Sequence, residues 1–334
     1  MRVIIHDYTD PYFNMAAEEY LLENETQDVF MLWRNDNAVV IGKNQNTWAE
    51  VNVPFTEEHG ITVVRRLSGG GAVFHDLGNV NFTYITAHDP ARGIDFRPFL
   101  QPILRALASL GVEAEADGRN DVVVNGAKIS GNAQCVHRLP DGGERLLHHG
   151  TMLFSSNLSR LTSALKVSPE KIRAKGVTSV RQRVTNLKDV PGFPREMTVE
   201  EFMNHLARTV VSADAELIPL TEEETAGIRA LRDKKYAAWE WNFGASLRHE
   251  SEKSLRFPFG TLNASYTAKN GAIESIRLFG DYFGQRPVSE LENALVGIPL
   301  RADALAAALT ALSAPVADYI HGAAAEDIVR LILQ

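Results

Sequence analysis

The chain has 334 residues, 45% of them hydrophobic, with a formal net charge of -8 at pH 7. That length exceeds most single domains, so we expect two domains with substantial cores. The acidic balance argues against a general nucleic-acid binder, because such proteins need a basic surface to neutralise phosphates.

The single cysteine, Cys135, cannot form an intramolecular disulfide, so no feature depends on an oxidising compartment. The apolar run at residues 3–5 is broken by His6, far too soon for a secretory signal, and no stretch of about 18 apolar residues follows. We therefore expect a cytoplasmic protein with no membrane contact.

The predicted elements begin with an amphipathic helix over residues 14–23, with acidic residues opposite its apolar side. Short β-branched and aromatic runs between residues 29 and 86 predict a sheet. A helix over residues 96–110 and further strands to Phe154 follow, with a turn at Asn125-Gly126.

Residues 158–231 are predicted to be mainly helical, including a helix opened by Thr221 with an acidic first turn. A more polar stretch over residues 245–252 is typical of a linker. Beyond it, two strand-like runs flank Asn270-Gly271, and Ala/Leu-rich helices fill the remainder. We predict an α+β protein with a large domain over residues 1–244 and a small one over residues 253–334.

Residues 69–71 are three consecutive glycines between strand-like runs, preceded by Arg65 and Arg66. Such glycines permit positive φ and bring backbone N–H groups close to an anion, and the arginines would add positive charge. The loop matches neither a Walker A motif nor a dinucleotide fingerprint, because Gly-Lys-Ser/Thr is missing and the glycine spacing fails at Phe74. A flexible hairpin with solvated arginines is equally compatible with the glycines alone.

A second candidate site lies in the hairpin predicted around Asn125-Gly126. That turn would pair Val123 with Lys128 and Asp121 with Ser130, which places Asp121, Lys128 and Ser130 on one face. Asp121 would lie diagonal to Lys128, at roughly 7 to 8 Å between strands. The two can form a simple ion pair, or Lys128 can be the fixed cation needed where a carboxylate is joined to a nucleotide phosphate.

A third candidate is the pair His148-His149 in an apolar run. Adjacent strand residues point to opposite faces, so both cannot bind one metal and no zinc site is expected. At most one of them faces a ligand.

Together, RRLSGGGAVFHDLGN, GRNDVVVNGAKISGNA and HHGT resemble the lipoate-protein ligase A family in order and spacing. GKNQNTW, KGVTSVRQRVTNL and WEWNFG extend the resemblance to about residue 244, and the rest is similar mainly in length and pattern. The resemblance implies a catalytic domain of the biotin/lipoate ligase type, with mixed sheets and flanking helices, followed by a small accessory domain.

The same resemblance implies an activity. Lipoate and ATP would form lipoyl-AMP, with Mg²⁺ screening the phosphates. The lipoyl group would then pass to a specific lysine of a lipoyl domain of 2-oxoacid dehydrogenase complexes or of glycine cleavage H protein.

The resemblance also assigns roles to individual residues, with Lys128 as the catalytic lysine that bridges the lipoate carboxylate and the nucleotide phosphate. The implied ATP contacts are Arg66, Gly71, Ala72, Val73, Phe74 and Lys128. The implied lipoate contacts are Ser68, Gly70, His75, Lys128, His149 and Thr151. Asn120 and Asp121 would lie near the phosphate and its magnesium.

Residues 166–189 hold seven basic and two acidic residues, a net charge of +5. A solvated basic face is the usual explanation. The resemblance marks the segment as a loop covering the adenylate, and we hypothesise that Arg181 and Arg183 help attract acidic acceptor domains. It also suggests rotation of the small domain about a hinge at residues 244–251.

Three alternatives remain. An octanoyl or lipoyl transferase working through a thioester would carry a cysteine where Leu146 stands, and Cys135 has no neighbour in sequence that convincingly lowers a thiol pKa. A biotin ligase has a differently ordered glycine- and arginine-rich loop. A non-catalytic lipoyl-carrier or nucleotide-binding protein would be expected to lack Lys128 or an intact glycine loop.

Overall fold

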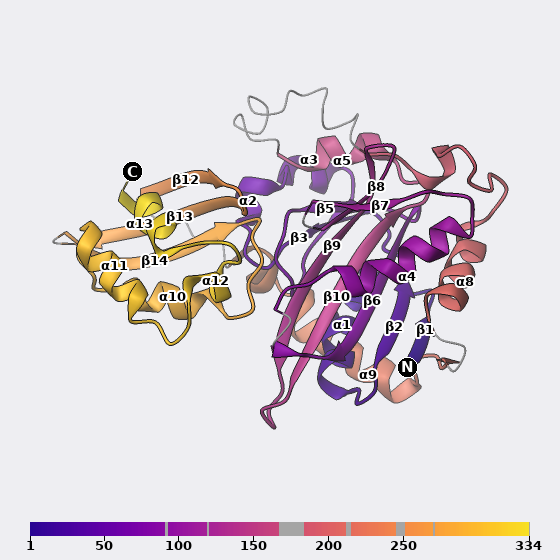
Figure 1. The fold of residues 1–334 in the computed structure, drawn as a ribbon, viewed down its shortest axis with the longest axis horizontal. Helices are drawn as coiled ribbons and strands as arrows, with labels where there is room; N and C mark the ends of the chain where they lie inside the picture. Colours follow the sequence, from indigo (N-terminus) through magenta and orange to yellow (C-terminus); the bar gives the residue numbers. More distant parts are fainter. Residues whose placement is uncertain are drawn as a thin grey trace.

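The computed structural model describes residues 1–90, 93–118, 120–166, 184–211, 215–244, 251–269 and 271–333. It has two lobes, a large one from the first three quarters of the chain and a small one, orange to yellow in Figure 1, from the rest. No helix among the described residues is long and apolar enough to cross a membrane. The elements confirm the α+β class.

An eight-stranded mixed sheet forms the centre of the large lobe. In spatial order its strands are β11 (Glu216–Leu217), β1 (Arg2–Ile5), β2 (Val29–Trp33), β6 (Asn79–Ala87), β10 (Glu144–Leu153), β9 (Ala127–Arg138), β8 (Asp121–Val124) and β7 (Glu115–Asp117). On one face, α4 (Arg97–Ala108) and α8 (Val199–Val210) bury their apolar sides against Phe82 and Tyr84. On the other face lies α1 (Pro11–Asn24), which buries Met15 and Leu21 against β2.

A second, three-stranded sheet packs on the α1 side, in the order β4 (Thr62–Arg65), β3 (Ala38–Ile41), β5 (Val73–His75). The expected all-strand region is interrupted here by two short helices, α2 (Thr47–Glu50) and α3 (Val53–Glu58). Asn46 caps α2 through its side chain, and Pro54 stands in the first turn of α3, where a missing N–H does no harm. The cap and the proline are the local sequence signals for these helices, and each is weaker than the strand pattern on either side.

The first helix corrects another expectation. Two of its three acidic residues do not lie on a solvated side, because Glu18 is only 1% exposed and Glu19 only 7%, whereas Glu23 is exposed. Glu19 pairs with Lys235 at 2.6 Å, and Glu18 accepts hydrogen bonds from two side chains of the large sheet. Both sides of α1 are therefore buried, one against apolar groups and one against polar groups.

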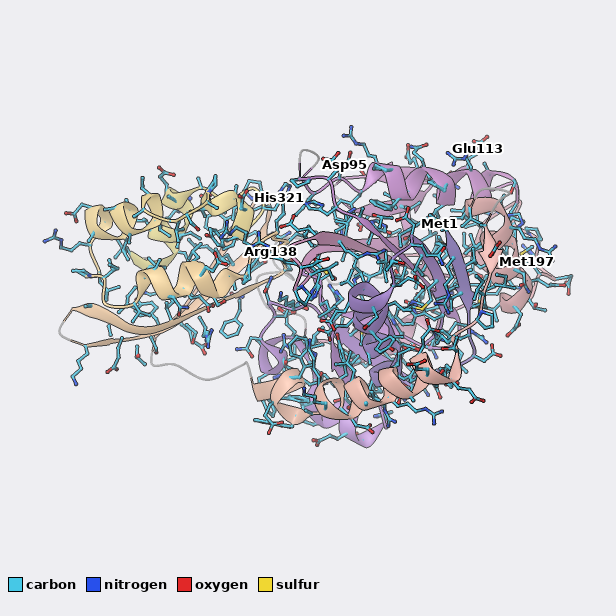
Figure 2. All side chains as sticks on the ribbon, turned by 90° about the horizontal axis from the view of Figure 1, so that it is seen from below. Met1, Asp95, Glu113, Arg138, Met197 and His321 are labelled. Atoms are coloured by element: carbon cyan, nitrogen blue, oxygen red, sulfur yellow. The ribbon has the colours of Figure 1, made fainter. Side chains whose placement is uncertain are left out.

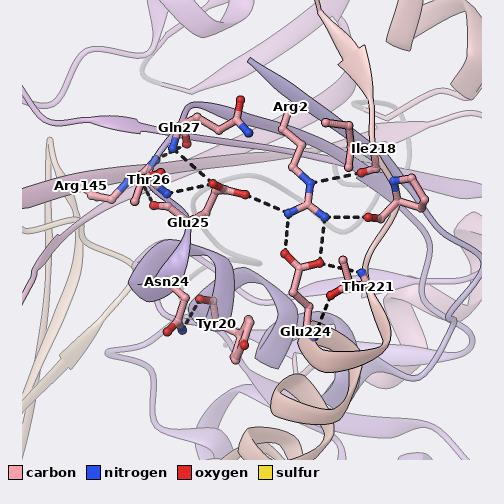
Figure 3. Close-up of polar contacts among 11 residues, drawn as sticks. Arg2, Tyr20, Asn24, Glu25, Thr26, Gln27, Arg145, Ile218, Thr221 and Glu224 are labelled. Carbon is pink, nitrogen blue, oxygen red and sulfur yellow. Dashed lines mark hydrogen bonds and ion pairs between the residues drawn. The ribbon is translucent and has the colours of Figure 1, made fainter.

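The Arg2 cluster, made of Arg2, Glu25 and Glu224, ties the sheet edge to two helices (Figure 3). Arg2 donates to both oxygens of Glu224, at 2.5 and 2.9 Å, and to Glu25 at 2.9 Å. Its remaining hydrogen bonds go to the carbonyls of Ile218 and Pro219. The predicted cap of α9 (Glu222–Leu231) is confirmed, since the Thr221 side chain accepts from the Glu224 N–H.

The helices between residues 158 and 244 are mostly short. Beside α8 and α9 they are α5 (Leu158–Ala164), η2 (Leu187–Asp189), η3 (Arg232–Tyr236) and η4 (Glu240–Gly244). Residues 167–183, most of the predicted adenylate-covering segment over residues 166–189 and including Arg181 and Arg183, lie outside the described residues.

The small lobe is an antiparallel sheet of β12 (Ser251–Phe257), β13 (Gly260–Lys269) and β14 (Ala272–Gly280). Its helices, α10 (Val288–Leu295), α11 (Ala302–Thr310), α12 (Val316–Tyr319) and α13 (Ala325–Leu333), gather over one face (Figure 2). Strands on both sides of Asn270-Gly271 are as predicted. Residues 245–250 of the predicted linker and hinge lie outside the described residues, and β12 already begins at Ser251.

Candidate active site

A cavity of about 160 Å³ opens between the large sheet and the β4-β3-β5 sheet. It brings together the glycine loop, the β8–β9 hairpin and β10, three segments that the sequence singled out separately. The sequence-predicted residues on its wall are Arg66, Gly70, Gly71, Ala72, Val73, His75, Asn120, Lys128, His149 and Thr151. Its closed end is formed by buried side chains such as Met15, Trp33 and Val40.

Three predicted residues do not line this cavity. Phe74 is buried in a separate apolar cluster against the β4-β3-β5 sheet. Ser68 is fully buried below the glycine loop, and Asp121 stands beside Lys128. These residues can affect the cavity only through their neighbours or through contacts with a bound ligand at its rim.

The three glycines of the loop differ in what a side chain at their positions would meet. Gly70 has φ +90°, a backbone conformation that residues other than glycine rarely adopt. A Cβ on Gly69 would lie 2.1 Å from the carbonyl oxygen of Tyr282 in the small lobe. A Cβ on Gly71 would meet no atom within 4 Å, so this position is open on the side where a Cβ would point.

The small lobe reaches the loop directly. The Gly70 N–H donates to the Tyr282 carbonyl at 3.2 Å, and the Phe283 ring lies 3.2 Å from where a Gly70 Cβ would be. Phe283 is fully buried beside Phe96 of the large lobe. The conformation of the loop therefore depends on the position of the small lobe.

The two arginines have separate tasks, which corrects the expectation that both add positive charge at the glycine loop. Arg65 points away from the cavity and donates to the carbonyls of Gly42, Lys43, Gln45, Trp241 and Asn242. It thereby joins the GKNQNTW and WEWNFG segments. Arg66 lines the cavity, is buried, and holds the loop through the carbonyls of Gly69 and Gly71.

Lys128 lies at the open end of the cavity. The Asn125-Gly126 turn is confirmed by φ of +50° and +76°. Val123 pairs with Lys128 as predicted, but a β-bulge then shifts the register, so Asp121 pairs with Gly131 and not with Ser130. Ser130 is buried and does not line the cavity.

The Lys128 ammonium is held in place by an ion pair and by the room that a glycine leaves beneath it. Its Nζ lies 2.7 Å from Asp121 Oδ1, with about a third of each side chain exposed. It crosses directly over Gly131, where a Cβ would come within 2.8 Å of Nζ. The lysine is thus positioned by its neighbours and still accessible to a ligand.

The two histidines point to opposite faces as predicted. His148 stacks on Phe99 among the α4 side chains, and burial lowers its pKa well below the ordinary value. His149 faces the cavity, and both of its nitrogens are occupied. Nε2 lies 2.6 Å from Ser68 Oγ, and Nδ1 lies 2.9 Å from Glu18 Oε1.

Glu18 was missed at the sequence level, as was Thr83, which donates to it at 2.7 Å. Nothing in the pattern of a helix distinguishes a buried glutamate from a solvated one. The histidine on the facing strand was the one available hint, because a buried imidazole needs a partner.

Cys135 is not placed for catalysis. It lies on a second cavity of about 350 Å³ between the lobes, away from Lys128 and the glycine loop's open side. Burial raises the pKa of its thiol to about 12, so the thiolate needed for a thioester is suppressed at neutral pH.

The described residues contain no group of three or more His, Cys, Asp and Glu suited to a metal ion. Asn120 and Asp121 do stand together at the open end, where Asn120 donates to the Asn132 carbonyl at 2.6 Å. One or two oxygen ligands are what Mg²⁺ usually takes from a protein when nucleotide phosphates supply the others. The donor set fits that mode.

Two family models match the chain. The lipoyl protein ligase A/B catalytic domain matches residues 10–211, and the bacterial lipoate protein ligase C-terminus matches residues 246–332. Lipoate-protein ligase LplJ of Bacillus subtilis is 41% identical over 97% of both chains. Lipoate-protein ligase 1 of Staphylococcus aureus is 42% identical over 87% of this chain and 88% of its own.

Solved structures agree over one or both lobes. LipL1 of P. falciparum in complex with lipoate aligns with a TM-score of 0.79 at 25% identity, covering 100% of this chain and 99% of its own. A bipartite lipoate protein ligase of Thermoplasma acidophilum, studied with its E2 lipoyl domain, gives 0.63 at 31% identity over 75% and 98%. Lipoate-protein ligase A bound with ATP gives 0.61 at 28% identity over 74% and 99%.

Proposed function

The chain belongs to the lipoate-protein ligase family, and from that membership we propose that it activates lipoate with ATP and transfers the lipoyl group to a protein lysine. The observation that carries the proposal is Lys128, an accessible ammonium beside Asp121 at the open end of a cavity whose closed end is buried and includes apolar side chains. An acyl tail fits the closed end, and its carboxylate then lies near the lysine.

In the first half-reaction a carboxylate oxygen of lipoate attacks the α-phosphorus of ATP. The bond to the β-phosphate breaks, and pyrophosphate leaves. Two anions are brought together in this step, so the Lys128 charge lowers the barrier by stabilising the extra negative charge of the transition state. Backbone N–H groups of residues 71–73 and the charge of Arg66 favour the nucleotide in the same region.

Mg²⁺, bound through Asn120 and Asp121 together with the phosphates, would neutralise phosphate charge. Asp121 also pairs with the Lys128 ammonium, whose Nζ lies 2.7 Å from Oδ1, and so holds that charge at the open end of the cavity.

The second half-reaction is aminolysis. The acceptor lysine attacks the mixed anhydride, a C–N bond forms, the bond between the acyl carbon and the AMP oxygen breaks, and the amine loses a proton. Positioning and charge stabilisation suffice, so no enzyme nucleophile is required. The raised pKa of the Cys135 thiol and the Leu146 side chain at the transferase cysteine position both favour this direct route over a thioester.

We assign the acceptor to the lipoyl domains of 2-oxoacid dehydrogenase complexes or to glycine cleavage H protein. The support is the family resemblance and the study of the T. acidophilum ligase with its E2 lipoyl domain. Recruitment of an acidic acceptor by Arg181 and Arg183 belongs to this proposal. Charge reversal at both positions should slow transfer from preformed lipoyl-AMP, and an unchanged rate would contradict the recruitment.

The decisive experiment is lipoate-dependent exchange of labelled pyrophosphate into ATP. Lys128→Ala should reduce exchange about 100-fold to 1000-fold, the usual cost of removing one group that stabilises transition-state charge. Lys235→Ala is a matched control, because Lys235 also pairs with a glutamate but lies outside the cavity. Exchange that survives Lys128→Ala would refute the mechanism.

A further inference from the structure

Two hydrogen-bond donors at the closed end of the cavity have no partner among the described residues. They are His75 Nε2 and Asn81 Nδ2. Both side chains line the cavity and are only 3% and 2% exposed. The lining also has one unpaired acceptor, Asn132 Oδ1. Buried polar atoms are nearly always paired, so the two unpaired donors indicate that the ligand brings an acceptor to them.

The proton of His75 is assigned by a chain of amides. Asn14 Nδ2 donates to the carbonyls of Tyr8 and Arg34, which fixes the orientation of that amide. The same nitrogen donates to Asn35 Oδ1 at 2.9 Å. Asn35 Nδ2 therefore faces His75 Nδ1, at 3.1 Å, and donates to it.

Because Nδ1 of His75 accepts, the proton of the neutral ring is on Nε2, the atom without a partner. Burial, with the nearby charge of Arg66 second, lowers the pKa of His75 to about 3, so the ring is neutral at pH 7. His75 thus offers one N–H donor to the cavity.

Asn81 contributes a second donor. Its Oδ1 accepts from Asn79 Nδ2 at 2.9 Å, and in this orientation its Nδ2 faces no partner among the described residues. His149, by contrast, has both nitrogens engaged and offers only its ring. Around the two donors lie apolar groups of Met15, Trp33 and Val40.

An acyl tail with a hydrogen-bond acceptor near its end suits this closed end, and a saturated tail does not. A saturated chain would seal both donors away from water without a partner, whereas a dithiolane ring is apolar and carries sulfur lone pairs that accept weakly. Building on the proposed function, we propose that His75 and Asn81 give the enzyme its preference for the sulfur-containing ring over all-carbon tails of similar size.

The test compares lipoate with 5-cyclopentylpentanoic acid, in which both sulfurs are replaced by CH₂, and with octanoate. Pyrophosphate exchange gives kcat/KM for each acid, and calorimetry gives the affinity of each acid for the unmodified protein. We expect lipoate to exceed the cyclopentyl acid about 10-fold in both measurements. In His75→Phe and Asn81→Leu the ratio should fall, and in the double variant it should approach one.

Tyr84→Phe is the matched control. Tyr84 is on the same strand as Asn81, and its hydroxyl also lacks a partner among the described residues, but it does not line the cavity. In Tyr84→Phe, the ratio of kcat/KM for lipoate to kcat/KM for the cyclopentyl acid should equal that of the unmodified protein.

A ratio near one in the unmodified protein, or one unchanged in folded single variants, would overturn the proposal. The calorimetric ratio of the unmodified protein can overturn the proposal by itself, and either single variant that folds suffices to assign the preference to its residue. Absence of exchange with every acid would instead count against the proposed ligase function, so the two failures are distinguishable.

Discussion

The Arg2 cluster and the wall of the ligand cavity are both built from buried or half-buried polar side chains of the large lobe, and both adjoin α1. In the Arg2 cluster, the guanidinium is matched by two carboxylates and two carbonyls. In the cavity wall, His75 and Asn81 each present an atom with no partner among the described residues. Paired polar groups hold the lobe together, and the unpaired donors on the cavity wall are placed to meet an acceptor on a ligand.

Glu18 offers the largest expected effect, because it lies behind the cavity residue His149 and is itself fully paired. Glu18→Ala removes the acceptor of Thr83 and His149 and leaves both donors buried. We expect the free energy of unfolding in urea to fall by about 3 to 5 kcal/mol. Glu223→Ala, at an exposed position, should stay within about 0.5 kcal/mol, and a similarly small loss for Glu18→Ala would mean that pairing at the cavity does not stabilise the fold.

Arg2→Ala tests the other region. The change leaves Glu224 and Glu25 without their cation, so the free energy of unfolding should drop by about 3 kcal/mol. Pyrophosphate exchange per folded molecule should not change, since the cluster has no part in the cavity. A raised KM for lipoate would show that the two regions are coupled.

The dependence of the free energy of unfolding on pH in the acid range sharpens the comparison further. The hydrogen bond from Arg2 lowers the pKa of Glu224 from 4.5 to about 2. A lowered folded-state pKa stabilises the protein above the unfolded value, and this contribution is lost as the pH falls from about 4.5 toward 2. Unfolding measured across that range should show Glu224→Gln about 2 kcal/mol less stable at pH 6 and nearly equal to the unmodified protein at pH 2. A difference that does not vary with pH would exclude the ion pair as its cause.

Gly131→Ala should have the smallest effect and should act on catalysis alone. The new Cβ would lie 2.8 Å from Lys128 Nζ, so the flexible end of the lysine must move. We expect exchange to fall about 10-fold, with little loss of stability. Gly126→Ala is a useful comparison at the hairpin turn, where a Cβ meets no atom but φ is positive, so it should cost stability and spare exchange.

The sequence was most informative where the structural signal is local. The Asn125-Gly126 turn, the Thr221 cap and the glycine loop each depend on the conformational preferences of a few consecutive residues. The strands that join them into one site could be placed because their apolar runs were clear.

The remainder of the site depends on packing between distant segments. Glu18 and Thr83 meet across 65 positions, and Asn35 meets His75 across 40, so no local pattern reveals either contact. No local pattern reveals the bulge beside Lys128 either. Ile129 has the sequence character of any strand residue, and its burial in the core accompanies the shift of register. Family resemblance supplied residue roles, but not the hydrogen-bond partners that enforce them.

The central claim, direct transfer from an adenylate, is tested by incubating the protein with lipoate and ATP without an acceptor. The quenched mixture is analysed for small molecules and for intact protein mass. The account predicts lipoyl-AMP at up to one equivalent per protein molecule and no gain in protein mass. A protein heavier by one lipoyl group, with that gain lost in Cys135→Ala, would contradict it.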